Sequence, residues 1–201
     1  ELGLGSGCVD AADMGSTDTF RFEEQALLDR CDDLIADGEI EQAAEIIEGR
    51  GRSFWVDRDV TRQGQWECVR LMAELARSIK QVREQLGKAA KKPDAWVDSY
   101  AERDGGWHKA DLLHRTLETR LATMEEDTEA QKALARVRQA QEQLLGTMAE
   151  GFSKSLRGAA WTFSNALPQT RVYPDVVDQG GQRTAYFAVD ALRYEMGVEL
   201  A

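Results

Sequence analysis

Apolar residues in the first half of the chain recur every three to four positions, which is the period of an amphipathic helix. Over residues 20–48 this pattern breaks once, at Asp37-Gly38, where glycine suits the left-handed turn that ends many helices. Two helices joined by a tight turn are therefore expected there. A second stripe over residues 66–86 predicts one long helix, and its members are Val69, Met72, Leu75, Ala76, Ile79, Val82 and Leu86. Together these elements predict a helical subdomain over residues 20–87, preceded by a flexible segment over residues 1–19.

A second helical subdomain is expected over residues 94–160. Pro93-Asp94 ends one helix and suits the start of the next, because proline cannot continue a helix and aspartate is a preferred cap. Helical spacing then returns over residues 96–102, 107–126 and 129–156. Asp127 or Thr128 is expected to cap the last of these helices. Because the connection between the two long helices is short, they are predicted to form an antiparallel hairpin.

The pattern changes again near the end of the chain. Residues 161–183 read as an irregular linker, in which Arg171-Val-Tyr173 suits a short edge strand. The apolar run Ala185–Val189 is too short for a buried helix and contains β-favouring residues, so it predicts a buried strand. Helical spacing resumes over residues 191–200. The predicted fold class is mainly α, a multi-helix antiparallel bundle followed by one or two short β-strands that begin an α/β core.

Asp190 is the first candidate for chemistry, because it follows the predicted strand directly. In open α/β sheets ligands bind at the carboxyl ends of the strands. A carboxylate is a hard ligand that suits a divalent metal ion, and a strand would hold it rigidly. The alternative is that Asp190 caps the following helix, which is a common role for aspartate. The two roles are compatible.

Two segments resemble a known family. Phe-Ala-Val-Asp-Ala-Leu-Arg-Tyr-Glu-Met-Gly, residues 187–197, resembles the opening motif of the PglZ domain, which is found in bacterial BREX/Pgl phage-resistance systems and is similar to the alkaline phosphatase superfamily. Residues 100–115, with Asp-Gly-Gly-Trp-His-Lys-Ala-Asp-Leu-Leu-His-Arg, resemble a less specific aromatic-Gly-Trp…Asp…Arg region of PglZ-type proteins. The resemblance implies that residues 184–201 begin an alkaline-phosphatase-like catalytic core, and that Asp190 is a metal ligand in it. Arg193 and Glu195 belong to the same signature without an assigned role.

The resemblance implies a parent protein that binds divalent metal ions, zinc foremost, and hydrolyses phosphoesters. Its expected partners in antiviral defense are a methyltransferase and an ATPase of the same system. A phosphatase core needs further strands, a nucleophile and more Asp and His ligands, and the chain begins without Met and stops at Ala201. We therefore interpret the chain as a fragment, mainly a helical scaffold, which is inactive alone and holds no tightly bound metal.

Composition and charge narrow the function classes further. The formal net charge of −11 opposes general binding to nucleic-acid phosphates, and this disfavours a DNA-binding helical domain. A local basic patch at Lys88, Lys91 and Lys92 is the exception. No apolar run approaches the ~20 residues that a membrane span needs. The three cysteines are scattered without a Cys-x-x-Cys motif, which favours a reducing cytoplasm over a disulfide framework.

Asp111, His114 and Glu118 share one face of their predicted helix, which is the arrangement of half a di-metal site in a helix bundle. The chain has only two histidines, and His108 lies on another side. Polar pairing within the helix is therefore the favoured interpretation.

A second interpretation of the whole chain is a helical protein–protein interaction module without enzymatic activity. Its apolar stripes carry no chemistry of their own, and exposed ones would bind a partner or form a homodimer. Trp55 and Trp66 could form a ligand platform, but large aromatic residues at helix junctions more often fill the core. Cys68 likewise belongs to a helical stripe and is expected in the core.

Overall fold

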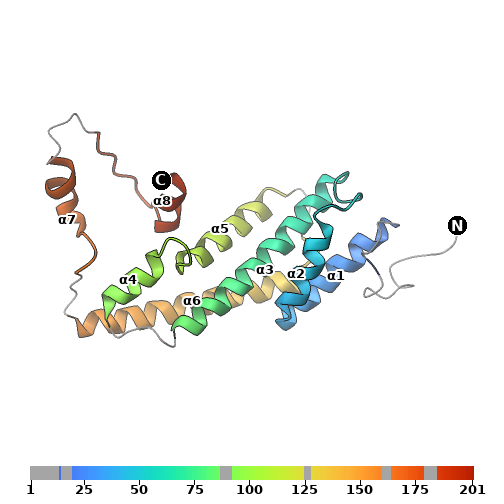
Figure 1. The fold of residues 1–201 in the computed structure, drawn as a ribbon, viewed down its shortest axis with the longest axis horizontal. Helices are drawn as coiled ribbons and strands as arrows, with labels where there is room; N and C mark the ends of the chain where they lie inside the picture. Colours follow the sequence, from blue (N-terminus) through green and yellow to red (C-terminus); the bar gives the residue numbers. More distant parts are fainter. Residues whose placement is uncertain (1–13, 15–19, 87–91, 125–127, 160–163, 179–184) are drawn as a thin grey trace.

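The computed structural model describes residues 14, 20–86, 92–124, 128–159, 164–178 and 185–201. The fold is mainly helical (Figure 1). The helices are α1 (Phe22–Asp37), α2 (Ile40–Arg50), α3 (Val60–Leu86), α4 (Pro93–Ala101), α5 (His108–Ala122), α6 (Gln131–Gly158), α7 (Gln169–Val172) and α8 (Tyr194–Leu200). One π-helical turn over Tyr173–Val177 extends α7. None of the helices in these ranges is both long and apolar enough to cross a membrane.

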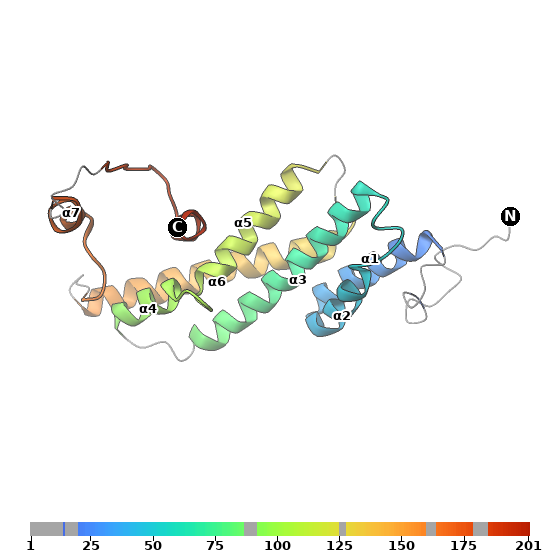
Figure 2. The same cartoon turned by 45° about the horizontal axis from the view of Figure 1, so that its top comes forward.

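The long helix α3 is the centre of the bundle. It packs against α1, α2, α5 and α6, and Figures 1 and 2 show it between the α1–α2 pair and α5. The most deeply buried side chains of the core come from α1, α3, α5 and α6, and include Leu28, Ile35, Met72, Leu75, Leu117 and Leu144. Residues of both predicted helical subdomains therefore share one hydrophobic core.

Gly38 ends α1 as the sequence predicts. Its φ of 88° lies in the left-handed region, and its backbone N–H donates to the carbonyl of Ile35. The N–H of Glu39 donates to the carbonyl of Leu34 at 2.8 Å. These bonds satisfy carbonyls that the end of the helix would otherwise leave unpaired, and they fix the turn into α2.

The third helix begins at Val60, six residues before the expected start. Asp59 is the reason, because its Oδ1 accepts hydrogen bonds from the N–H groups of Thr61 and Arg62. These bonds hold the pKa of the Asp59 carboxyl below its usual value, with the ion pair to Arg21 adding to the effect. The stretch between the two predicted helical regions of this subdomain is thus partly helix.

The start of α6 is held by a residue from another helix. Asp32 of α1 is buried, and its Oδ1 accepts a hydrogen bond of 2.7 Å from the N–H of Ala133. Thr128, one of the two predicted caps, accepts a longer bond of 3.4 Å from Ala130, while Asp127 lies outside the described residues. The hydrogen bond to Asp32 therefore caps α6 and also links α1 to α6.

The end of the chain differs from the prediction. Residues 185–189 are extended, but they pair with no strand among the described residues, and they are exposed rather than buried. Phe187 is 81% exposed. The predicted edge strand at residues 171–173 is helical instead. A strand needs a neighbour to satisfy its backbone and cover its apolar face, and no described segment supplies one. Residue 184 lies outside the described part.

Candidate functional site

Asp190 lies in an exposed turn between the extended segment and α8. Its Oδ1 accepts a hydrogen bond of 2.9 Å from the N–H of Ala191. Ala191 has a φ of 56°, in the left-handed region that costs a residue with a Cβ about 1 kcal/mol or more. Helix α8 begins only at Tyr194 with Arg193 in the cap position, so Asp190 does not cap the helix as the alternative interpretation held. The turn instead presents the carboxylate to solvent.

The residues around Asp190 do not make a metal site by themselves. Within the part of the chain that the structure describes, no three His, Cys, Asp or Glu side chains come together in a way that could hold an ion. A two-metal site needs clustered ligands. Asp190 can therefore serve as one ligand only if other residues join it.

Helix α8 is docked on the turn between α4 and α5. The hydroxyl of Tyr194 donates a hydrogen bond of 2.8 Å to the carbonyl of Ala101. The Tyr194 ring lies 5.8 Å from the ring of Tyr100 and 5.2 Å from that of His108. Three rings from three helices therefore form one cluster.

Arg115 of α5 binds two acids of α8. Its Nη2 lies 2.5 Å from Oε2 of Glu199, and its Nε lies 3.8 Å from Oε1 of Glu195. Glu195 is only 1% exposed. A buried carboxylate needs a nearby opposite charge, because desolvation disfavours its ionised form. Arg115 therefore both neutralises Glu195 and holds α8 against the bundle.

Beside this contact lies a cavity of about 460 Å³, which we call the aromatic cavity. Its lining residues come from α4, α5, α6 and α8 and are mostly aromatic or aliphatic: Trp96, Val97, Tyr100, Ala101, Trp107, Asp111, Leu145, Met148, Ala149, Phe152 and Tyr194. Trp96 stands edge-on to Trp107, with ring centroids 5.4 Å apart, and its ring lies 6.4 Å from that of Phe152. Gly151 lets α6 approach this wall, since a Cβ there would lie 2.4 Å from the Trp96 ring.

Among the described residues that line this cavity, Asp111 is the one acid. Its Oδ2 accepts a hydrogen bond of 2.7 Å from the Tyr100 hydroxyl, and its Oδ1 accepts one of 2.8 Å from Nε2 of Gln141. Burial raises the pKa of the Asp111 carboxyl, the Tyr100 bond opposes this, and the charge of Glu195 adds to the rise. Burial and the bond to Asp111 also raise the pKa of the Tyr100 hydroxyl.

The turn that positions these groups depends on Gly106. A Cβ at this position would lie 2.3 Å from the carbonyl oxygen of Glu102 and 2.6 Å from that of Tyr100. The same Tyr100 carbonyl lies 2.8 Å from Nδ1 of the buried His108 and accepts its proton in that tautomer. His108 is therefore part of the support of the α4–α5 turn.

The other predicted candidates have structural roles. Nε2 of His114 lies 3.6 Å from Glu118, which Arg138 of α6 holds in a bidentate ion pair at 2.6 and 2.7 Å. Asp111 lines the aromatic cavity instead, so Asp111, His114 and Glu118 do not gather around one possible metal position. Their contacts are polar pairs, as the favoured interpretation expected.

The tryptophans and Cys68 of the first subdomain are also largely structural. Trp66 is buried, and its Nε1 donates a hydrogen bond of 2.8 Å to Glu24. The Glu24 carboxylate also accepts a hydrogen bond of 3.0 Å from Arg50. Trp55 is half-buried and stands edge-on to Phe54. Cys68 is fully buried, and burial raises its thiol pKa to about 11.

Sequence reasoning missed the aromatic cavity. A signal was present, because lining residues recur at a spacing of four on α4 (Trp96 and Tyr100), at the start of α5 (the cap residue Trp107 and Asp111) and on α6 (Leu145 and Ala149). Nothing in the spacing shows that these three faces meet. Comparison of the chain with protein-family models, with curated proteins and with solved structures finds no match.

Proposed function

We propose that this chain is the helical part and the first core segment of a PglZ-type, metal-dependent phosphoesterase of a bacterial BREX/Pgl defence system. In this proposal the helical bundle is a scaffold without catalytic groups. Asp190 contributes one ligand of a divalent metal site, zinc foremost, and the remaining ligands come from outside the described residues. The proposed setting is the bacterial cytoplasm, with a methyltransferase and an ATPase as partners.

One observation carries the proposal: the two segments that resemble the family contact each other. Residues 100–115 supply Tyr100, His108 and Arg115, and these side chains contact Tyr194, Glu195 and Glu199 of the C-terminal segment. Two unrelated chance resemblances, about seventy positions apart in the chain, would have no physical reason to share an interface. A scaffold that positions the first element of a catalytic core would need such a contact.

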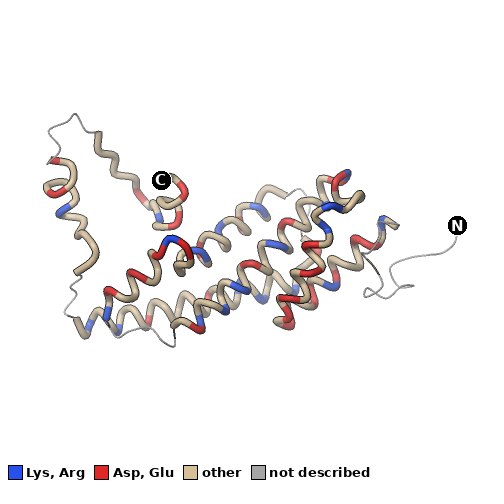
Figure 3. The backbone as a smooth tube through the Cα atoms, in the orientation of Figure 1, with Lys and Arg blue, Asp and Glu red and all other residues tan. Residues whose placement is uncertain are grey.

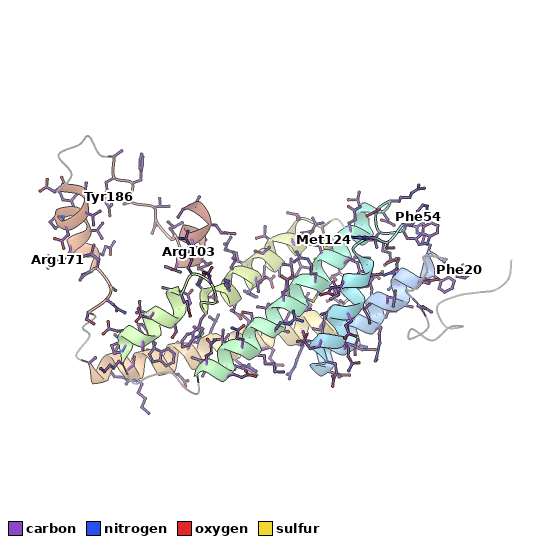
Figure 4. The ribbon with its side chains drawn as sticks, in the orientation of Figure 1. Phe20, Phe54, Arg103, Met124, Arg171 and Tyr186 are labelled. Carbon is purple, nitrogen blue, oxygen red and sulfur yellow. The ribbon has the colours of Figure 1, made fainter. Side chains whose placement is uncertain are left out.

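The geometry of Asp190 also supports the proposal. The extended residues 185–189 leave their backbone groups free of strand pairing within the described part, so they can add to a sheet. Figure 4 shows Tyr186 on this segment, away from the helical bundle. The left-handed Ala191 beside Asp190 is the kind of local strain that clusters at functional sites.

The test begins with the source gene past the codon for Ala201. The proposal expects several hundred further codons that encode a Thr or Ser nucleophile and clusters of Asp and His. The encoded full protein should hydrolyse bis-p-nitrophenyl phosphate when zinc, manganese or magnesium is added. Asp190→Asn should lower this rate by about 100-fold or more, because a bound metal supplies several kcal/mol of transition-state stabilisation. Asp178→Asn, at another exposed acid, is the matched control and should leave the rate unchanged.

A stop codon at or just after Ala201 would sink the phosphoesterase proposal. A full protein that binds no metal by elemental analysis, or whose hydrolysis ignores Asp190→Asn, would do the same.

The second candidate function is a helical interaction module, and exposed apolar side chains at both ends of the molecule favour it. Phe20 and Phe54 are 42% and 45% exposed at the end opposite α7 (Figure 4), while Phe187 and Leu200 are exposed near the C-terminus. Such side chains gain from burial against a partner. Sedimentation equilibrium of the chain tests this candidate, and a monomer at all concentrations would exclude the homodimer.

A further inference from the structure

We propose that the aromatic cavity binds a small organic ammonium ion, with the apolar part of the ligand against the rings of Trp96 and Phe152 and the protonated amine beside Asp111. This inference concerns the cavity alone and does not depend on the proposed phosphoesterase function.

The size and lining of the cavity suit a small ligand with an apolar body. Its volume of about 460 Å³ lies in the range of small-molecule sites, about 300–1,000 Å³. Trp96, Phe152 and Met148 line it from two helices, and Tyr194 closes it from α8. Aromatic faces carry partial negative charge and attract cations within about 6 Å. The walls therefore accept either a neutral apolar group or a cation, and they disfavour an anion.

The charge in the lining of the cavity favours a cation. Among the described residues that line it, Asp111 is ionisable as an acid, and the lining includes no lysine or arginine. Figure 3 shows acidic and basic residues mixed along the helices, and the Glu118–Arg138 ion pair is one such neutral combination. A monovalent cation in the cavity would pair with the Asp111 carboxylate, which a neutral or acidic ligand would not do.

The hydrogen bonds around Asp111 leave acceptor atoms that could take further donors. Gln141 is 1% exposed. Its Nε2 donates a hydrogen bond to Asp111, while its Oε1 has no hydrogen-bond partner among the described residues. A buried acceptor without a donor destabilises the folded state. Both Asp111 oxygens already accept one bond each, and a carboxylate can accept more. The Asp111 carboxylate therefore has acceptor capacity left in the cavity, which suits an amine that brings its own N–H groups.

The experiment uses the 201-residue chain and three probes with one carbon skeleton: 4-phenylbutylamine, 4-phenylbutan-1-ol and 4-phenylbutyrate. Binding is measured by calorimetry at pH 7 and by the change in tryptophan fluorescence, to which Trp96 and Trp107 in the lining contribute. The amine should bind about tenfold or more tightly than the alcohol, a difference that corresponds to one favourable charge contact. The carboxylate should bind least.

Two variants locate the site. Asp111→Asn keeps the shape of the side chain and should remove the amine's advantage over the alcohol. Gly151→Ala places a methyl group against the Trp96 ring and should weaken all probes. Glu102→Gln, at an exposed acid of the same turn that does not line the cavity, is the matched control and should change nothing. Circular dichroism checks that each variant is folded.

Three results would overturn the inference. The first is equal or tighter binding of the alcohol or the carboxylate to the unmutated chain, a comparison that needs no variant to fold. The second is absence of amine binding, or amine binding that Asp111→Asn leaves intact. The third is a lysine-containing peptide that binds about tenfold more tightly than the free amine, which would assign the cavity to a polypeptide side chain instead.

Discussion

Replacement of Arg115 by methionine tests how α8 is held on the bundle. The variant keeps most of the apolar stem of the side chain and removes the guanidinium that faces Glu195 and Glu199. Glu195 then stays buried without its nearest positive charge. The expected result is that α8 detaches more often while the core of α3, α5 and α6 stays folded, because Arg115 is not a member of that core.

The magnitude follows from the contact distance. Two unit charges 3.8 Å apart attract by about 4 kcal/mol at an effective dielectric of about 20. Arg115 is about a third exposed, at 31%, so solvent screening reduces this to about 2 kcal/mol. That free energy corresponds to an increase of about 30-fold in the equilibrium constant for opening of α8.

Hydrogen–deuterium exchange of the peptide over residues 194–201 measures this opening. A seven-residue helix is not stable alone, so protection of its amides reports docking. Arg70→Met breaks an exposed ion pair with Glu74 on α3 and is the control, with almost no expected change in α8. The reasoning is refuted if Arg115→Met leaves exchange in α8 unchanged, or if the control speeds it equally.

Three further results are expected. Glu24→Ala removes the carboxylate partner of a buried arginine and should lower the free energy of unfolding in urea by about 3–5 kcal/mol; a loss below 1 kcal/mol would contradict the role of the network. Cys31 and Cys68 are buried with thiol pKa values raised to about 12 and about 11, so both should resist Ellman's reagent at pH 8 in the native chain and react fully in urea. Because the pKa of Asp111 is raised above its usual 3.8, the native state binds this proton more tightly than the unfolded state, and its contribution to stability should fall as the pH rises through the raised value. The difference in unfolding free energy between the unmutated chain and Asp111→Asn, followed from pH 3 to pH 8, should therefore shift against the unmutated chain as the pH rises, and a flat difference would refute the assignment.

The helices were predictable from the sequence because their signals are local. The spacing of apolar residues on α3 and α6 depends only on the 3.6-residue period, and Gly38 ends α1 through its own backbone freedom. The buried position of Cys68 followed from the same kind of stripe, and that of Trp66 from its size and its place at a helix junction. Local signals misplaced the start of α3, where Asp59 acts as a cap that the stripe of apolar residues does not reveal.

The segment over residues 185–189 shows the limit of such signals. Its composition favours a strand, but a strand is completed by hydrogen bonds to a neighbour that its own residues do not contain. In the described part of the chain it is extended and exposed. Asp190 is accordingly presented in a turn, and its proposed role as a metal ligand stays a prediction.

What belongs to the tertiary structure alone is the set of contacts between helices far apart in the chain. Asp32 caps α6 from α1, Arg115 holds Glu195, and Asp111 meets Gln141 at the wall of the aromatic cavity. The sequence singles out Asp111 and Glu195, but it does not show which side chain of another helix each one meets. Only the way the helices pack decides which of these faces meet, because a helix specifies the direction of its side chains but not the identity of the neighbour they reach.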